Sequence, residues 1–415
     1  MYKAPRGTAD VLPADQPYWR YVTQHAERLC QLYGYKRIDS PLFEEAGLFN
    51  RSVGEGTDIV EKETYSFEDR GHDLLTLRPE GTAPVCRAYL EHGMHNLPQP
   101  VKLYYIAPSF RYERPQAGRY RQFSQFGFEA IGVQDPVLDA EVIDMAWQFY
   151  QQLSITGLTV LLNSIGDKQC RPAYLKAIVE HFSARKESLC RDCQVRLQKN
   201  PLRLLDCKEP QDQALIQGAP RTIDYLCQDC KDHFRQVESH LRALQVPYRL
   251  EHRLVRGLDY YTKTVFEVVP QEGGSQSSVG AGGRYDDLIE ELGGKPTPAI
   301  GFAAGMERVV LNLKKLGTAV PDDAQVDAYV MFLGEEAKER ATLLAQNLRA
   351  AGVKTTLSFG ERSLRAQMRH ANSIGARYAL ILGEDEVSSN SVLVRKMDDS
   401  SQESVPLTDV VTRLR

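Results

Sequence analysis

The chain has 415 residues, of which 42% are hydrophobic and 26% are charged, and its formal net charge is −4. These values are typical of a soluble globular protein with two or three domains. The small negative charge excludes a protein that binds nucleic acid through an overall positive charge, so any such contact must come from local basic patches. No apolar run approaches the roughly 18 residues of a membrane-spanning helix, so no membrane contact is expected. Residues 1–15 hold no apolar block, so we expect no secretion signal and a cytoplasmic location.

Up to residue 162 the hydrophobic pattern predicts helices and short strands. Val22, Ala26 and Leu29 recur at helical spacing, and Gly34 ends that helix. The other elements predicted in this part are helices at 83–93 and 135–154, and strands at 35–38, 65–67, 74–77, 101–106, 119–129 and 158–162.

Residues 168–245 differ from their surroundings because they are mostly helical, charged and rich in cysteine, and we predict an inserted subdomain there. After it, the pattern predicts strands at 249–254, 261–269 and 298–302, and helices at 286–292 and 306–316. The successive strands favour antiparallel pairing. Residues 1–320 are therefore predicted to form an α+β domain with a mixed, mostly antiparallel sheet, interrupted by the helical insertion.

A linker is predicted at 317–327, and the pattern of predicted elements changes after it. Strand and helix patterns then alternate, at 328–332, 335–351, 354–357, 363–374 and 378–382. Such alternation is typical of parallel strands joined by helices. We therefore predict a separate small α/β domain over residues 325–415.

The stretch 109–129 is expected to form two strands around an arginine-rich loop. Side chains two or four residues apart on a strand share a face, so Arg111 points with Glu113, and Gln125 points with Glu129. Charges on a buried face are costly unless they are paired or bind something, which favours a ligand platform. The alternative is a solvated hairpin face with surface ion pairs.

The turn Arg78–Thr82 lies between a strand and a helix and holds Glu80 on a rigid backbone. A carboxylate on such a turn could receive an ammonium group. The alternative is that Thr82 only caps the helix and that Arg78 and Glu80 form a surface pair.

Two later stretches carry further candidates. In 254–267, Arg256 offers a planar, always charged group suited to phosphate oxygens, and Tyr260 and Tyr261 are expected to point to opposite faces of a strand. In 301–311, small residues lead into a helix whose first turn carries Arg308, which could stack on or grip a flat or phosphorylated group. The alternatives are an ordinary edge strand and close helix–sheet packing.

The cysteines concentrate in the insertion. Cys190 and Cys193, together with Cys227 and Cys230, match the spacing of a structural zinc ribbon. The alternative is a cluster of reduced thiols, and Cys207 has no place in the four-ligand site.

The sequence resembles the bacterial histidyl-tRNA synthetase family, which belongs to the class II aminoacyl-tRNA synthetases. Phe110–Glu113 is similar to class II motif 2, and 301–311 is similar to motif 3. The helix ending near Gly34 resembles motif 1, the dimer-forming element. Two narrower stretches, 254–267 and 373–379, are similar to segments that distinguish the histidine enzymes.

The resemblance implies a two-step ligase. Such an enzyme uses ATP and Mg²⁺ to form histidyl-adenylate from L-histidine, and then passes histidine to the 3′-terminal ribose of tRNA(His). It further implies a homodimer, and an anticodon-binding role for residues 325–415. Two alternatives remain: a non-catalytic paralogue that regulates ATP phosphoribosyltransferase, and a zinc-bearing RNA-binding module.

The resemblance also implies which residues bind histidine. Glu80, Thr82 and Gln125 would take the α-ammonium group, while Glu129 and Tyr261 would hydrogen-bond the imidazole nitrogens. The full implied set is Glu80, Thr82, Arg111, Gln125, Glu129, Arg256, Tyr260 and Tyr261.

For ATP, the resemblance implies that Glu113 and Phe123 hold adenine, with Arg308 stacked on its far face. Arg119 would meet the γ-phosphate. Arg111 would contact both the histidine carboxylate and the α-phosphate. Arg111 and Arg256, which lies against the same phosphate, are the implied catalytic residues.

Overall fold

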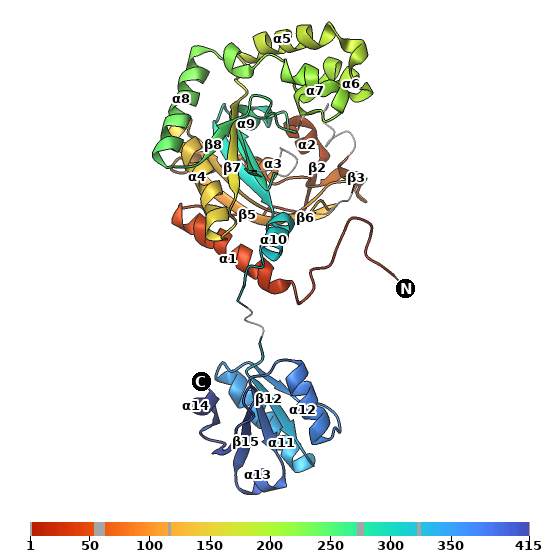
Figure 1. The fold of residues 1–415 in the computed structure, drawn as a ribbon, viewed down its shortest axis with the longest axis vertical. Coiled ribbons are helices and arrows are strands. Elements are labelled where there is room, and N and C mark those ends of the chain that lie inside the picture. Colours follow the sequence, from red (N-terminus) through yellow and green to blue (C-terminus); the bar gives the residue numbers. More distant parts are fainter. Residues whose placement is uncertain (1, 54–62, 115–117, 272–277, 322–324, 415) are drawn as a thin grey trace. The chain divides into compact units, whose positions relative to one another are not determined.

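The structure is a computed structural model that describes residues 2–53, 63–114, 118–271, 278–321 and 325–414 (Figure 1). It contains two compact units, Met1–Val320 and Pro321–Arg415. Parts of the linker and of the arginine-rich loop predicted from the sequence, residues 322–324 and 115–117, lie outside the described residues.

The first unit is built on an eight-stranded sheet whose central strands are antiparallel, while the edge pairs β1–β5 and β7–β8 are parallel. The predicted mixed, mostly antiparallel sheet is therefore confirmed. In spatial order its strands are β1 (Lys36–Arg37), β5 (Val101–Phe110), β6 (Gln122–Ile131), β11 (Ala299–Gly305), β10 (Gly280–Arg284), β9 (Thr262–Pro270), β7 (Leu158–Ser164) and β8 (Tyr248–Leu250).

One face of this sheet packs on helices and holds the larger core. Phe126 and Phe128 of β6 point to this face, as does Phe266 of β9, and all three are fully buried. The helices that contribute to this core are α1 (Gln16–Leu32), α4 (Pro136–Gln152), α8 (Gln228–Ala243) and α10 (Met306–Lys315). Because side chains alternate along a strand, Gln125 and Glu129 of β6 must point to the opposite face.

The opposite face is only partly covered. Val85 and Tyr89 of α3 pack there against Tyr105 of β5 and Val265 of β9. The elements on this side are α3 (Thr82–Glu91), α9 (Leu288–Glu291), η2 (Met94–Asn96), α2 (Ala46–Val53) and a small antiparallel sheet of β2 (Phe43–Glu45), β4 (Leu74–Leu77) and β3 (Tyr65–Glu68).

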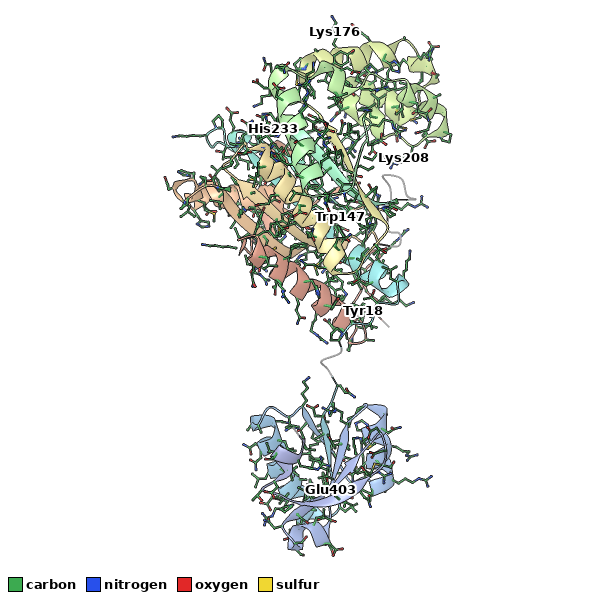
Figure 2. The ribbon with its side chains drawn as sticks, turned by 60° about the vertical axis from the view of Figure 1, so that its left-hand side comes forward. Tyr18, Trp147, Lys176, Lys208, His233 and Glu403 are labelled. Atoms are coloured by element: carbon green, nitrogen blue, oxygen red, sulfur yellow. The ribbon has the colours of Figure 1, made fainter. Side chains whose placement is uncertain are left out.

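A buried charge group joins α8, α4 and β10 across the helix-covered face. Nε of Arg284 donates to Oδ1 of Asp139 at 2.6 Å, and Nε2 of His233 lies 2.8 Å from Oδ2 of the same carboxylate. His233 lies on α8 where that helix passes α4 (Figure 2). Burial alone would raise the pKa of Asp139, but Arg284 and His233 hold it below its usual value.

Residues between β7 and β8 form the helical insertion. Its own small core includes Tyr174, Ile178, Phe182 and Leu204. Its elements are α5 (Arg171–Ser183), η3 (Lys186–Ser188), α6 (Arg191–Lys199), η4 (Pro201–Asp206), α7 (Pro210–Gln217) and η5 (Thr222–Tyr225), and α8 then returns the chain to the main core.

The second unit is a five-stranded sheet with helices. The predicted parallel pairing is confirmed for β13, β12 and β14, while β15 and β16 add an antiparallel edge that the sequence analysis did not predict. In spatial order the strands are β13 (Thr355–Leu357), β12 (Ala328–Phe332), β14 (Tyr378–Leu382), β15 (Ser391–Lys396) and β16 (Gln402–Pro406). The helices are α11 (Glu335–Ala350), α12 (Leu364–Ser373), α13 (Glu384–Ser388) and α14 (Val410–Leu414).

Among the described residues, every helix is too short or too polar to cross a membrane.

Candidate active site

A cavity of about 820 Å³ lies on the partly covered face of the large sheet. Part of its lining comes from small residues of the neighbouring strands β10 and β11, namely Ala281, Ala303 and Gly305. The predicted residues that line it are Arg111, Glu113, Arg119, Phe123, Arg256 and Arg308. The structure thus brings together every predicted ATP-binding residue and both predicted catalytic arginines.

The arginine-rich hairpin supplies one wall. Arg111 lies just beyond β5, where its Nε donates to the carbonyl of Pro79 at 2.8 Å and its guanidinium lies 5.5 Å from the centre of the Phe123 ring. Glu113 sits between two cations, with carboxylate oxygens 3.8 Å from Nη1 of Arg111 and 3.7 Å from Nη1 of Arg119. One carboxylate thus faces two arginines, which leaves positive charge for an anionic ligand.

The first turn of α10 closes the same wall. Nε of Arg308 donates to the carbonyl of Gly118 at 3.2 Å, which ties the helix to the hairpin. Burial lowers the pKa of Arg308. The neighbouring Glu307 accepts the backbone N–H of Ser124 at 2.7 Å, and burial raises its pKa to about 7.

Arg256 enters the cavity from the opposite side. It forms an ion pair with Glu267 of β9, and its guanidinium lies 5.6 Å from the centre of the Tyr261 ring. In the described part of the protein, Nε of Arg256 and Oε2 of Glu267 are buried without a hydrogen-bond partner. Buried polar groups without partners are costly, which fits a site completed by a ligand. No role was predicted for Glu267, although its carboxylate stands alone in the apolar run of β9.

The predicted histidine-binding carboxylates lie beside the cavity and are absent from the part of its wall that the structure describes. Glu129 is only 1% exposed. It accepts hydrogen bonds from Thr82 Oγ1 at 2.8 Å and from Tyr285 Oη at 2.5 Å, and Tyr105 Oη lies 3.4 Å away. Burial raises the pKa of Glu129 to about 8 despite these hydrogen bonds, which favour the ionised form.

A glycine makes room for this carboxylate. Gly301 of β11 is the direct cross-strand neighbour of Glu129, and a Cβ added to Gly301 would lie 1.6 Å from Oε2 of Glu129. From the sequence, the small residues near 301 are predicted to admit a flat or phosphorylated group. Here the group that approaches Gly301 is a side chain of the protein itself.

Glu80 lies at the N-terminus of α3. Its two oxygens accept the backbone N–H groups of Thr82 at 2.6 Å and of Ala83 at 2.9 Å. Burial raises the pKa of Glu80, and these backbone donors oppose the rise. The surface pair between Arg78 and Glu80 is not formed, because Arg78 is buried and donates to the carbonyls of Pro108 and Ser40 and to the Ser40 hydroxyl.

The two tyrosines of the 254–267 stretch contact one another, with ring centroids 4.7 Å apart, and both are buried in one cluster. The prediction that they point to opposite faces is wrong, because β9 begins only at Thr262 and the alternation of a strand does not apply before it. Tyr260 also packs edge-on against Tyr285, so aromatic contacts run from Arg256 through Tyr261 and Tyr260 to the group around Glu129.

Gln125 and two residues that the sequence analysis missed complete the site. Gln125 Oε1 accepts the Ser109 hydroxyl at 3.1 Å. Tyr105 of β5 and Tyr285, which directly follows β10, place their hydroxyls at Glu129 but lie far apart in the sequence, so no local pattern marked them. Gly81 and Gly127 leave room for the Tyr105 ring, because a Cβ on either would lie 2.3 or 2.4 Å from it.

The predicted four-cysteine site is wrong. Cys190 and Cys193 gather with Cys207, whereas Cys227 and Cys230 gather in a separate group. The local spacing of each Cys-x-x-Cys pair held no information on which pairs the helices between them would bring together.

Comparison with known proteins gives the family. A family model described as histidyl-tRNA synthetase matches residues 7–309, and a model described as an anticodon binding domain matches residues 327–415. The chain belongs to the histidyl-tRNA synthetase family. The resemblance seen in the sequence is therefore confirmed.

Relatives of this synthetase family match the chain over nearly its whole length. The histidine–tRNA ligase of Dehalococcoides mccartyi is 54% identical over 100% of this chain and 99% of its own. That of Desulfitobacterium hafniense is 48% identical over 98% of this chain and 96% of its own. The crystal structure of apo S. aureus histidyl-tRNA synthetase is 38% identical, with a TM-score of 0.84 and full coverage of both chains.

Proposed function

We propose that this member of the histidyl-tRNA synthetase family ligates L-histidine to tRNA(His) in two steps. ATP and histidine first form histidyl-adenylate and pyrophosphate, and histidine then passes to the 3′-terminal ribose of the tRNA. The observation that carries this proposal is a single cavity lined by Arg111, Arg119, Arg256 and Arg308 beside a buried carboxylate ringed by hydroxyls.

The proposed first step needs positioning and positive charge more than proton transfer. The carboxylate of histidine is already ionised at neutral pH and can attack the α-phosphate without a general base. Catalysis then consists of aligning the two groups and stabilising the charge that develops on the phosphoryl oxygens. Arg111 and Arg256 line the cavity from opposite sides and are the groups we expect at the α-phosphate.

For ATP, we propose that Phe123 and Arg308 hold the two faces of adenine, that Glu113 holds its edge and that Arg119 meets the γ-phosphate. Mg²⁺ is usually bound through substrate phosphates together with one or two carboxylates, and it would neutralise phosphate charge here. Besides Glu113, the carboxylates that line the described cavity and could share the ion with the phosphates are Glu63, Asp206, Glu251, Glu267 and Glu307.

For histidine, we propose that Glu129 and Tyr261 hydrogen-bond the two imidazole nitrogens, with Tyr260 alongside. Glu80, Thr82 and Gln125 would receive the α-ammonium group. A site built to hydrogen-bond a substrate rejects analogues that lack the matching groups, because buried polar atoms are then left unpaired. The burial of Glu129 and of its hydroxyl partners supports this mode of selection.

We further propose a cytoplasmic homodimer whose C-terminal unit binds the anticodon. Apolar side chains exposed near the element that resembles motif 1 support the dimer, since Leu32 is 69% exposed and Phe43 is 50% exposed. The regulatory-paralogue alternative is less supported, because the full-length relatives carry the ligase name.

The proposed function is tested by incubating the purified protein with ATP, Mg²⁺, radiolabelled histidine and a tRNA(His) transcript. We expect ATP-dependent transfer of label to acid-precipitable tRNA. Stimulation of an ATP phosphoribosyltransferase without any charging of tRNA would support the regulatory alternative and overturn the proposal.

A further inference from the structure

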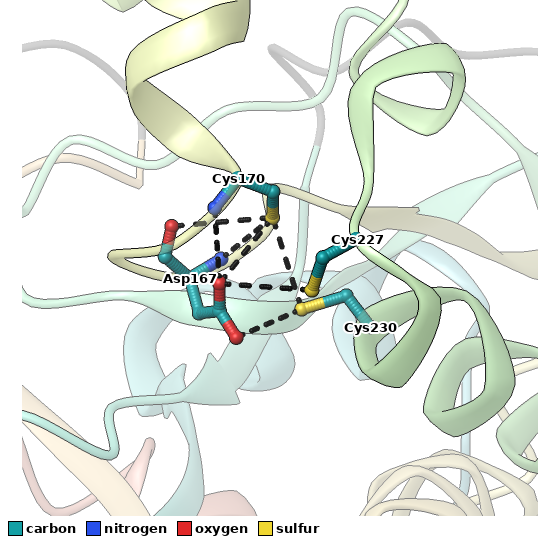
Figure 3. Close-up of side chains that lie close together, drawn as sticks. All are labelled: Asp167, Cys170, Cys227 and Cys230. Carbon is teal, nitrogen blue, oxygen red and sulfur yellow. Dashed lines mark hydrogen bonds between the residues drawn. The ribbon is translucent and has the colours of Figure 1, made fainter.

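The insertion holds two clusters of the same composition, each with three cysteines and one aspartate. In each cluster the four potential ligand atoms lie within 4.8 Å of one another. The first cluster, shown in Figure 3, is Asp167, Cys170, Cys227 and Cys230, and the second is Cys190, Cys193, Cys207 and Asp212.

The spacing of the ligand atoms matches the edges of a tetrahedron around one ion. Zn–S bonds of about 2.3 Å place two sulfurs about 3.8 Å apart. Cys170 Sγ lies 3.8 Å from Cys230 Sγ, and Cys190 Sγ lies 3.8 Å from Cys207 Sγ. A disulfide would bring the sulfurs to about 2.05 Å, much closer than they lie here.

In each cluster the aspartate supplies the fourth potential ligand atom, and the two aspartates are held in the same way. Oδ2 of Asp167 lies 3.1 Å from Cys230 Sγ, and Oδ2 of Asp212 lies 3.1 Å from Cys207 Sγ. The other oxygen of each carboxylate is held by backbone N–H groups, those of Gln169 and Cys170 for Asp167 and that of Cys190 for Asp212. Such hydrogen bonds orient metal ligands in known sites.

The backbone beside each cluster donates hydrogen bonds to the cysteine sulfurs, and in the first cluster a glycine makes room for one of them. The N–H of Asp167 donates to Cys170 Sγ at 3.3 Å, and the N–H of Cys193 donates to Cys190 Sγ at 3.4 Å. Gly166 has a φ of +68°, and a Cβ at this position would lie 2.6 Å from Cys170 Sγ. A glycine is therefore required where the chain turns into the first cluster.

Burial argues for a cation in the second cluster. Asp212 is fully buried, as is Cys193, and a carboxylate placed among three thiols loses its hydration. A divalent ion with three thiolates and one carboxylate would compensate that loss. Thiolate sulfur with a compact four-ligand set favours Zn²⁺ among the common divalent ions.

We infer that each cluster binds one Zn²⁺, so that the insertion carries two structural zinc ions with Cys₃Asp coordination. The first ion joins the two ends of the insertion, because Asp167 and Cys170 follow β7 and precede α5, while Cys227 and Cys230 begin α8. The second joins α6 to the segment after η4.

The second ion also supports the candidate active site. Cys207 and its neighbours Leu205, Asp206 and Lys208 line the cavity (Lys208 is labelled in Figure 2). A small helical core gains rigidity from a structural metal. On the proposed function, zinc at the second cluster therefore holds one wall of the ATP site in place.

The test is metal analysis of the full chain purified without chelators. We expect about two zinc ions per chain in the wild type and about one in each of Cys170→Ala and Cys207→Ala. Cys86→Ala, which changes an equally buried cysteine outside both clusters, should keep two. A folded wild-type protein without zinc, or a single ion that both variants lose, would overturn the inference.

Cobalt titration of the wild-type apoprotein decides the question even if a variant fails to fold. We expect thiolate-to-cobalt absorption and tetrahedral d–d bands that saturate at two equivalents. Saturation at one equivalent, or the absence of these bands, would contradict the two-site assignment. Neither measurement depends on catalysis, so failure of the zinc sites and failure of the proposed function can be told apart.

Discussion

The hydroxyl of Tyr285 donates a hydrogen bond of 2.5 Å to Oε2 of Glu129. Tyr285 directly follows β10 and Glu129 lies in β6, so the bond links two strands that β11 separates in the sheet. Thr82 binds the other oxygen of the same carboxylate. The side chain that we propose to recognise imidazole is therefore held at both oxygens before any substrate arrives, which is the condition for a rigid and selective polar site.

The pH dependence of stability should carry the signature of Glu129. Its folded pKa of about 8 lies above the ordinary value of 4.5, so folding favours the protonated form. Protonated Glu129 therefore contributes fully to the free energy of unfolding below pH 4.5, its ordinary pKa. This contribution is lost as the pH rises through about 8. Glu129→Gln removes this titration. We expect the free energy of unfolding of the variant, relative to wild type, to increase between about pH 5 and about pH 9 in urea unfolding experiments. A difference independent of pH would contradict the assignment.

Arg256→Ala should reduce histidine-dependent pyrophosphate exchange by about 10²- to 10³-fold while histidine still binds, because a cation at the α-phosphate acts mainly in the transition state. Isothermal titration with histidine separates the two effects. Arg253→Ala is the matched control, since Arg253 also lines the cavity but pairs with Glu251. Arg256→Ala leaves the Glu267 carboxylate buried and without its ion-pair partner, which could itself disturb folding. The double variant Arg256→Ala/Glu267→Gln removes that unpaired charge, so it shows whether a loss of exchange activity comes from misfolding. Unchanged exchange in Arg256→Ala would refute its role.

Gly301→Ala and Gly305→Ala form a matched pair on β11. A Cβ at Gly301 collides with the Glu129 carboxylate, whereas a Cβ at Gly305 meets nothing within 4 Å. Overpacking of this kind costs about 1–3 kcal/mol. We expect Gly301→Ala to lower the thermal midpoint and raise the KM for histidine, and Gly305→Ala to leave the thermal midpoint near wild type. Equal midpoints in the two variants would mean that the contact between Gly301 and Glu129 does not constrain the site.

Removal of residues 325–415 should separate the two steps. Each compact unit has its own hydrophobic core, so residues 1–320 are expected to fold alone. We predict pyrophosphate exchange within about threefold of the full chain and tRNA charging at least about tenfold weaker, the latter equivalent to about 1.4 kcal/mol. Equal loss of both activities in a folded fragment would contradict a separate anticodon-binding role.

Local periodicity predicted most strands of the first unit's sheet and the parallel strands of the second. The central strand β10 (Gly280–Arg284) was missed, because a glycine-rich run has no alternation of polar and apolar side chains and is typical of a turn. The antiparallel edge β15–β16 was missed, because Ser391–Lys396 and Gln402–Pro406 mix polar and apolar residues without a clear alternation. The residues around the cavity could be predicted because their charged side chains gather in short stretches that resemble motifs of the family, in the loop after β5, before β9 and at the start of α10. Glu267 lies outside that pattern, as a single carboxylate within the apolar strand β9.

Contacts between residues that are far apart in the chain could not be predicted from local sequence patterns. Tyr105 and Tyr285 look like ordinary core aromatics until the sheet places them at Glu129. The cysteine pairs were assigned to one site because their spacing fits a zinc ribbon, but the helices between them place each pair with other ligands. Asp167 and Asp212 were missed because a single aspartate near a cysteine carries no distinctive pattern.

The central claim, that the cavity joins histidine to ATP, is tested most directly by amino-acid-dependent ATP–pyrophosphate exchange with all twenty amino acids on the purified full chain. The account predicts strong exchange with histidine and background exchange with the other nineteen. Background exchange with histidine in a folded protein, or comparable exchange with another amino acid, would contradict it.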